Sequence, residues 1–127
     1  MPILLGILAY LIISFPLAVL WHMKIFRKKY LDWKYFGDDV QPAFGLASMI
    51  VQGAVLSYGY SMLSIHHLSL LTGIEYSMFM GLFLWSAHVL AAMGKSSHIR
   101  HVEFFLMETI YVAIQFGLYG ILIHYIF

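Results

Sequence analysis

Glu108 is the residue of this chain whose chemistry most needs explaining, because it is an acid inside the apolar run from Phe104 to Tyr111. A charged side chain in the middle of a membrane costs about 2.5–3.5 kcal/mol on insertion scales unless it is paired or neutral. An acid at such a position belongs either to a hydrogen-bonded network between helices or to a site that handles protons, ions or a metal.

Other polar residues fall at a similar depth once the apolar segments are taken as membrane-spanning helices. His88 lies about two turns before the end of the third segment, and His22 closes the first segment on the same side. His101 and Gln115 each lie seven residues from Glu108, a spacing that places all three on one helix face. The sequence therefore predicts an intramembrane polar network of Glu108, His88, Gln115, Gln52, His101 and His22.

Two interpretations of this network do not involve a metal. In the first, Glu108 and His88 form a neutral, hydrogen-bonded pair that fixes the register of the helices, since an apolar environment favours the neutral form of both groups. In the second, the network handles protons or ions, because intramembrane Glu and His side chains recur in transporters. Four spans leave little room for a gated pathway in one copy, so this second interpretation requires an oligomer.

A third interpretation involves haem or a metal ion. His22 and His88 could hold a haem iron between facing helices, and the set His98, His101 and Glu108 offers weak metal ligands. The Glu-x-x-His motif of di-iron bundles is absent. We predict no resident cofactor, with haem b or a metal ion as the lesser alternative. The neighbouring pair His66–His67 is expected to lie in an exposed loop on the opposite side.

Composition indicates an integral membrane protein. The chain has 127 residues, of which 62% are hydrophobic and only 10% charged, whereas soluble domains carry about 25% charged residues. Each of four apolar stretches is long enough to cross about 30 Å of hydrocarbon. The expected fold is an all-α membrane protein, a single four-helix transmembrane bundle over residues 1–127 with short loops and with spans at about 2–23, 42–63, 73–94 and 103–126.

The basic residues predict the orientation of the bundle. The first loop is basic and the third holds Lys95 and Arg100, whereas residues 64–72 contain no Lys or Arg. The positive-inside rule then places both termini outside. We expect the first helix to continue to about Tyr35, with its aromatic rings at headgroup level and its basic side chains at the membrane interface. These basic residues are Lys24, Arg27, Lys28, Lys29 and Lys34.

Helix ends and helix contacts also have sequence signals. Thr72 is expected to cap the third span in a capping box with Glu75, and Ser96 or Ser97 to cap the fourth. Small residues four apart let helix backbones approach closely in lipid. They predict a compact bundle that also offers a face to another membrane helix. The small packing residues are Gly53, Ser57, Ser77, Gly81, Ala113 and Gly117.

Three motifs resemble those of a group of small bacterial four-span membrane proteins of unknown function. The motifs are Leu20-Trp21-His22, Leu84-Trp85-Ser86-Ala87-His88 and Glu108-Thr109-x-Tyr111, and the resemblance covers nearly the whole chain. It implies a four-helix bacterial membrane protein, and we expect its location to be the bacterial inner membrane. It implies no activity and no catalytic residues.

The expected function is therefore non-enzymatic. The chain has no Ser-His-Asp set, P-loop or dinucleotide-binding glycine pattern, and its net charge of +1 gives no reason to expect nucleic acid as a partner. We predict an accessory or structural subunit of a larger membrane complex or homo-oligomer, whose partners are membrane lipids and other transmembrane subunits or itself. The alternative is an oligomeric proton-linked or small-solute carrier that uses Glu108 and His88.

Overall fold

The computed structural model describes residues 1–63 and 69–127, and every regular element within these ranges is a helix. Two of the helical segments, η1 and η2, have the wider π-helical winding, and η3 is a short 3₁₀ turn. The elements in chain order are α1 (Pro2–Ala18), η1 (Val19–Ile25), α2 (Arg27–Asp32), α3 (Pro42–Leu63), α4 (Leu70–Trp85), η2 (Ser86–Ala91), α5 (Ala92–Lys95), η3 (Ser97–Ile99) and α6 (Val102–Ile126).

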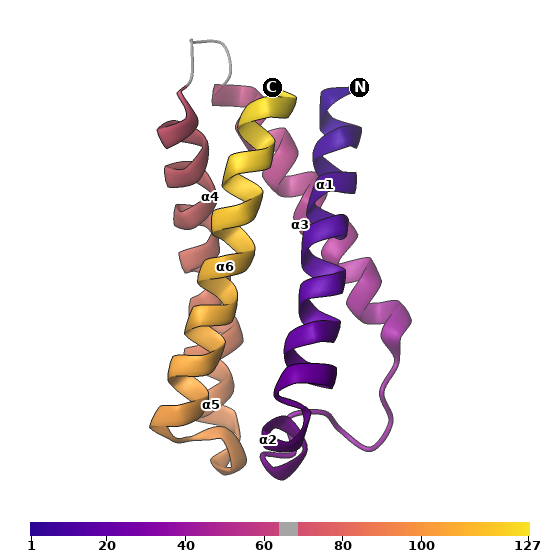
Figure 1. Ribbon diagram of the computed structural model, residues 1–127, viewed down its shortest axis with the longest axis vertical. Coiled ribbons are helices and arrows are strands. Elements are labelled where there is room, and N and C mark those ends of the chain that lie inside the picture. Colours follow the sequence, from indigo (N-terminus) through magenta and orange to yellow (C-terminus); the bar gives the residue numbers. More distant parts are fainter. Residues whose placement is uncertain (64–68) are drawn as a thin grey trace.

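Four continuous helical stretches are long and apolar enough to cross a membrane: Pro2–Ile25, Pro42–Leu63, Leu70–Lys95 and Val102–Ile126. The predicted four-helix bundle is confirmed, and the protein has the build of an integral membrane protein. Both termini lie at one end of the bundle, and α2 and α5 lie at the other (Figure 1). All seven Lys and Arg residues belong to the α2 and α5 end, which we call the basic end.

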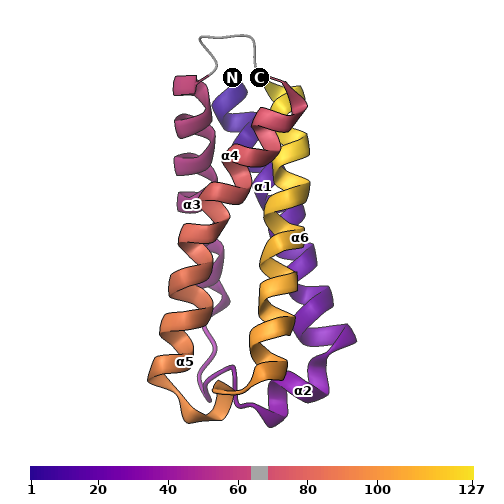
Figure 2. The same cartoon turned by 90° about the vertical axis from the view of Figure 1, so that its left-hand side faces the viewer.

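The four helices pack as two pairs joined by a central contact. α1 packs on α3 and α4 packs on α6, while α1 and α6 join the pairs. In Figure 2, α3 runs along the left side, whereas α4 crosses from beside the upper end of α6 to the lower left. α6 is the most buried of the four spans. Its buried residues recur every three or four positions, the spacing of one helix face, and include Glu108, Gln115 and Tyr119.

Close backbone approach between α4 and α6 depends on two glycines that are not among the predicted packing residues. A Cβ atom at Gly120 would lie 2.7 Å from the Cα of Ile74 and 2.9 Å from the carbonyl oxygen of Gly73. No side chain fits between backbones at these distances, so Gly73 and Gly120 set the separation of the two helices. Ser77 strengthens the same contact, because its hydroxyl donates to the Phe116 carbonyl at 2.6 Å.

The predicted small residues divide between the interior and the surface. Gly53 faces α1, since a Cβ there would lie 3.2 Å from the Cα of Ile7. Ser57 and Ser77 are fully buried, and Gly81 lies against Phe116. The other pair is outward: Ala113 is exposed, and a Cβ at Gly117 would meet nothing within 4 Å.

Two of the predicted helix caps are wrong. α4 begins at Leu70, and its cap is Ser69, whose hydroxyl accepts from the backbone N–H of Thr72. α6 begins at Val102 and is capped by His101, whereas Ser97 starts the short η3 turn. Ser69 lies three residues ahead of the predicted cap and offers the same hydroxyl acceptor, so the helix extends by one more turn.

The first helix does not run straight on to Tyr35, as the sequence suggested. The chain bends at Phe26, and α2 ends in a Schellman motif: the N–H of Lys34 bonds to the Leu31 carbonyl at 3.1 Å, and the N–H of Tyr35 to the Tyr30 carbonyl at 3.1 Å. Lys34 has φ 51°, the left-handed conformation. This turn points the chain back toward the bundle and brings the rings of Tyr30 and Tyr35 to 5.2 Å from each other.

Candidate functional site

Glu108 is fully buried and its carboxylate is held by three side chains. Its Oε1 lies 2.7 Å from the Nε2 of His22 and accepts a hydrogen bond of 2.5 Å from the Tyr30 hydroxyl. Its Oε2 lies 2.8 Å from the Nε2 of His88. The carboxylate is thus paired on both oxygens, as a buried ionisable group must be to avoid a large desolvation cost.

Four separate elements supply this site. Glu108 comes from the buried face of α6, Tyr30 from α2, His22 from η1 and His88 from η2. Both histidines therefore lie in π-helical segments, a winding that is rare and that occurs often at functional sites. Because the wider turn rotates the side chains relative to a regular α-helix, it determines which residues of each segment face the centre of the bundle.

A second layer of contacts fixes the residues around Glu108. The Nδ1 of His22 lies 3.0 Å from the carbonyl oxygen of Ala18. The indole N–H of Trp21 donates to the Tyr30 hydroxyl at 2.9 Å. The Tyr35 hydroxyl lies 3.1 Å from the Nε2 of His88, and its ring stacks on His22 at 5.3 Å with an interplanar angle of 4°.

These partners determine how many protons the His22–Glu108 pair holds. The carbonyl of Ala18 can only accept, so the Nδ1 of His22 carries a hydrogen. A contact of 2.7 Å between Nε2 and Oε1 requires one further proton, because two bare acceptors would repel each other. On Nε2 it makes an ion pair, and on Oε1 it makes a neutral pair. Tyr30 donates to the carboxyl group in both states, so the proton can change sides without breaking that hydrogen bond.

The tyrosines beside the site stay neutral. Burial raises the pKa of Tyr30 well above its ordinary value of 10, and the negative charge of Glu108 raises it further. Burial, and then the same charge, also raise the pKa of Tyr35. Tyr30 is therefore a hydrogen-bond donor to Glu108 at every physiological pH.

Gln115 and Gln52 form a second polar cluster further along the bundle. The amide of Gln115 donates to the Tyr10 hydroxyl at 2.8 Å and to the Ser14 hydroxyl at 2.9 Å, and Tyr10 donates to the Oε1 of Gln52 at 2.6 Å. The structure thus separates five of the six residues of the predicted network into two groups. Glu108, His22 and His88 lie at the basic end, and the two glutamines lie nearer the middle of the bundle.

His101 lies apart from both groups, so its predicted place in the network is wrong. Its Nδ1 accepts from the backbone N–H of Phe104 at 3.3 Å, and its ring packs on Trp33 at 4.8 Å. As the cap of α6 it lies just outside the helix, where the seven-residue spacing from Glu108 no longer defines a shared face. His98 is exposed. His66 and His67 lie outside the described residues.

The positions and hydrogen bonds of the histidines weaken the metal and haem alternatives. No group of three His, Asp or Glu side chains among the described residues is arranged to hold a metal ion, and His98 and His101 do not join Glu108. A haem iron between His22 and His88 would have to displace both imidazole hydrogen bonds to Glu108, because each histidine uses its Nε2 there.

Sequence reasoning missed the aromatic half of the site. Tyr30 and Tyr35 were expected at headgroup level, yet Tyr30 is fully buried and both contact the Glu108 cluster. They lie among basic residues, as aromatic residues at a membrane interface do. The local composition therefore did not indicate that they are buried in the site. Tyr10 was missed as well, because a single Tyr in an apolar span does not reveal its partner.

The basic interface residues line the outer part of this end. Lys29 forms an ion pair with Glu103. Lys24, Arg27 and Lys34 line a cleft of about 930 Å³ that also reaches His22 and Tyr30. The otherwise buried His22 ring, 6% exposed, therefore borders an opening at the basic end.

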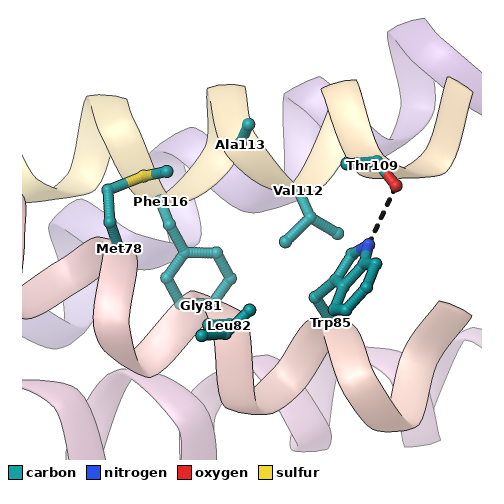
Figure 3. Close-up of a pocket in the computed structure, with 8 residues that line it drawn as sticks. All are labelled: Met78, Gly81, Leu82, Trp85, Thr109, Val112, Ala113 and Phe116. Atoms are coloured by element: carbon teal, nitrogen blue, oxygen red, sulfur yellow. Dashed lines mark hydrogen bonds between the residues drawn. The ribbon is translucent and has the colours of Figure 1, made fainter. Parts of the chain in front are cut away.

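A shallow apolar groove lies on the outer side of α4 and α6 (Figure 3). It has a volume of about 330 Å³, and within it the indole N–H of Trp85 donates to the Thr109 hydroxyl at 2.9 Å. Ala113, from the outward pair of small residues, is part of its wall. The lining residues are Met78, Gly81, Leu82, Trp85, Thr109, Val112, Ala113 and Phe116.

No protein-family model, curated protein or solved structure matches this chain. The resemblance to small bacterial four-span proteins therefore stays a prediction, and the function has to be argued from the geometry.

Proposed function

We propose that this chain is a proton-linked integral membrane protein in which the His22–Glu108 pair takes up and releases a proton from the basic end. The observation that carries the proposal is the 2.7 Å contact between the Nε2 of His22 and the Oε1 of Glu108, at a site that borders the cleft of the basic end. Because an intramembrane acid is costly unless it is paired, gain or loss of a proton by this pair changes its net charge and the cost of burying it. Proton binding can thereby be coupled to a change in packing.

Polar side chains that continue from Glu108 along the inner face of α6 support this proposal. Gln115 joins Tyr10 and Ser14, and one turn further the Tyr119 hydroxyl lies 3.0 Å from that of Ser57. From Glu108 to Tyr119 this column covers about 16 Å of helix rise. It spans roughly half of a hydrocarbon core of about 30 Å, so a complete crossing needs further polar groups from a second copy of the chain.

Access to the site is from the basic end. His22 borders the cleft that also contains Lys24 and Lys34, and the side chain of His88 is 33% exposed. In this proposal the basic end faces the cytoplasm of a bacterial inner membrane, following the positive-inside rule.

Infrared spectroscopy of the protein in nanodiscs tests proton binding directly. In a scan from about pH 5 to pH 8, wild-type protein should show a pH-dependent carboxyl band that Glu108→Gln removes. Glu75→Gln is the matched control, because Glu75 lies on α4 toward the opposite end of the bundle. A wild-type spectrum with no Glu108-dependent band change over this range contradicts the proposal.

Proton flux distinguishes a carrier from a purely structural network. After an acid jump, liposomes that contain wild-type protein or Glu75→Gln should acidify faster than empty liposomes, and those with Glu108→Gln should not. If all protein-containing liposomes match the empty ones, and Glu108→Gln only lowers the unfolding temperature, the site is a structural hydrogen-bonded core.

The second candidate function is an accessory or structural subunit of a larger membrane complex or homo-oligomer. The outward position of Ala113 and Gly117 beside the α4–α6 groove favours it, because small residues allow another helix to approach closely in lipid. Native mass spectrometry in mild detergent tests this candidate. If protein expressed at its native level is found only as a monomer without a partner, this candidate is contradicted.

A further inference from the structure

The cleft at the basic end has the lining of an amphipathic ligand site. Its apolar wall includes Val19, Met23 and Leu31, and its polar wall includes Lys24 and Arg27. Its volume of about 930 Å³ lies within the range of about 300–1,000 Å³ that is usual for small-molecule sites. An inorganic anion would fill only a small part of it.

The charge of the cleft is positive and is not neutralised by the protein. Lys24, Arg27 and Lys34 contribute +3 and Asp38 contributes −1, which leaves +2. Within residues 1–63 and 69–127, none of the three basic side chains forms an ion pair. Unlike Lys29, which is paired with Glu103, they are available to an external anion.

Lys34 adds an independent observation. It occupies the left-handed position of the Schellman motif, with φ 51°, where glycine is the usual residue. A residue other than glycine is strained in this conformation, and such strained residues cluster at ligand-binding and other functional sites. In this protein the residue at that position is a lysine, and its side chain lines the cleft.

The place of the cleft in the membrane decides the class of ligand. It lies where the first span, Pro2–Ile25, ends and the basic residues begin, beside the short α2 at the lower end of Figure 1. Val19 and Met23 belong to the span itself, so an acyl chain can follow them toward the hydrocarbon. Lys and Arg at this level attract anionic headgroups.

We propose that this cleft binds the phosphate headgroup of an acidic phospholipid, with Lys24, Arg27 and Lys34 as its cationic contacts. The site does not depend on proton binding at Glu108. The variant Glu108→Gln should therefore retain lipid binding, and the two proposals can fail separately.

The experiment is native mass spectrometry of the whole protein in non-ionic detergent, titrated with phosphatidylglycerol or phosphatidylcholine. Wild-type protein should retain phosphatidylglycerol in preference to phosphatidylcholine. Arg27→Gln/Lys34→Gln should bind phosphatidylglycerol more weakly, by about fivefold for each charge removed. Lys28→Gln/Lys95→Gln is the matched control, since it removes the same charge outside the cleft, and it should bind like wild type.

Three results would overturn the proposal. Equal losses in the two double variants would mean a general surface attraction. Displacement of the lipid by inorganic phosphate at equal concentration would mean a free-anion site. Equal retention of phosphatidylcholine would mean that charge does not select the lipid. If Arg27→Gln/Lys34→Gln loses its helical circular dichroism, Lys24→Gln alone gives the same comparison against Lys95→Gln.

Discussion

The hydroxyl of Tyr30 lies 2.5 Å from the Oε1 of Glu108, although 78 residues separate them in the chain. The same hydroxyl accepts from the indole N–H of Trp21. Tyr30 therefore bridges Trp21, near the end of the first span, and the buried acid of the fourth span. This contact connects the short helix α2 to the interior of the bundle.

Tyr30→Phe should therefore lower the free energy of unfolding by about 1–2 kcal/mol, because it leaves both Trp21 and Glu108 without this partner. Thermal unfolding in detergent measures the effect. Tyr58→Phe is the control, since Tyr58 is 60% exposed, and a surface change of this kind should cost less than about 0.5 kcal/mol. Equal costs for the two variants would mean that the Tyr30 hydrogen bonds contribute nothing measurable.

Alkaline pH should destabilise the fold through Tyr30 and Tyr35. Their pKa values are raised in the folded protein above the ordinary value of 10. The folded state therefore holds these protons more tightly than the unfolded state, so the stabilisation is complete below pH 10 and is lost as the pH rises above it. The unfolding temperature should fall above pH 10, with a shallower slope in Tyr30→Phe. An unchanged slope would show that Tyr30 does not contribute.

The contact between α4 and α6 should be sensitive to a single methyl group at Gly120. Gly120→Ala places a Cβ 2.7 Å from the Cα of Ile74, and overpacking of this kind typically costs about 1–3 kcal/mol. Gly117→Ala is the matched control on the same helix, because its Cβ would meet nothing within 4 Å. Chemical denaturation in detergent compares them. A comparable loss in Gly117→Ala would indicate that another chain covers the outward face.

Lys34→Gly should make the protein more stable, by about 1 kcal/mol, because glycine adopts the left-handed conformation without the steric cost that a Cβ incurs. The unfolding temperature reports the gain. Lys28→Gly removes the same charge from within α2 and should instead destabilise by about 1 kcal/mol, the helix penalty of glycine. If both variants destabilise, the backbone at Lys34 is not strained.

The sequence determined the number of spans and their approximate bounds, because an apolar stretch of sufficient length has no other stable arrangement in lipid than a helix. It also determined which end is basic. All Lys and Arg residues lie near the connection between the first and second spans or the connection between the third and fourth. The expectation that Glu108 has polar partners followed from the cost of an unpaired acid in hydrocarbon.

Only the tertiary structure decided which partners those are. His22 is 86 residues from Glu108 in the chain, and its side-chain direction depends on the π-helical winding of η1, which hydropathy does not encode. Tyr30 and Tyr35 reach the site because the chain turns back at Lys34, which has the left-handed conformation. A lysine in the sequence does not predict that conformation. His101 leaves the site because it caps α6 instead of continuing it. Each outcome depends on local backbone geometry, which sets the direction of a side chain, whereas composition and spacing set only its depth.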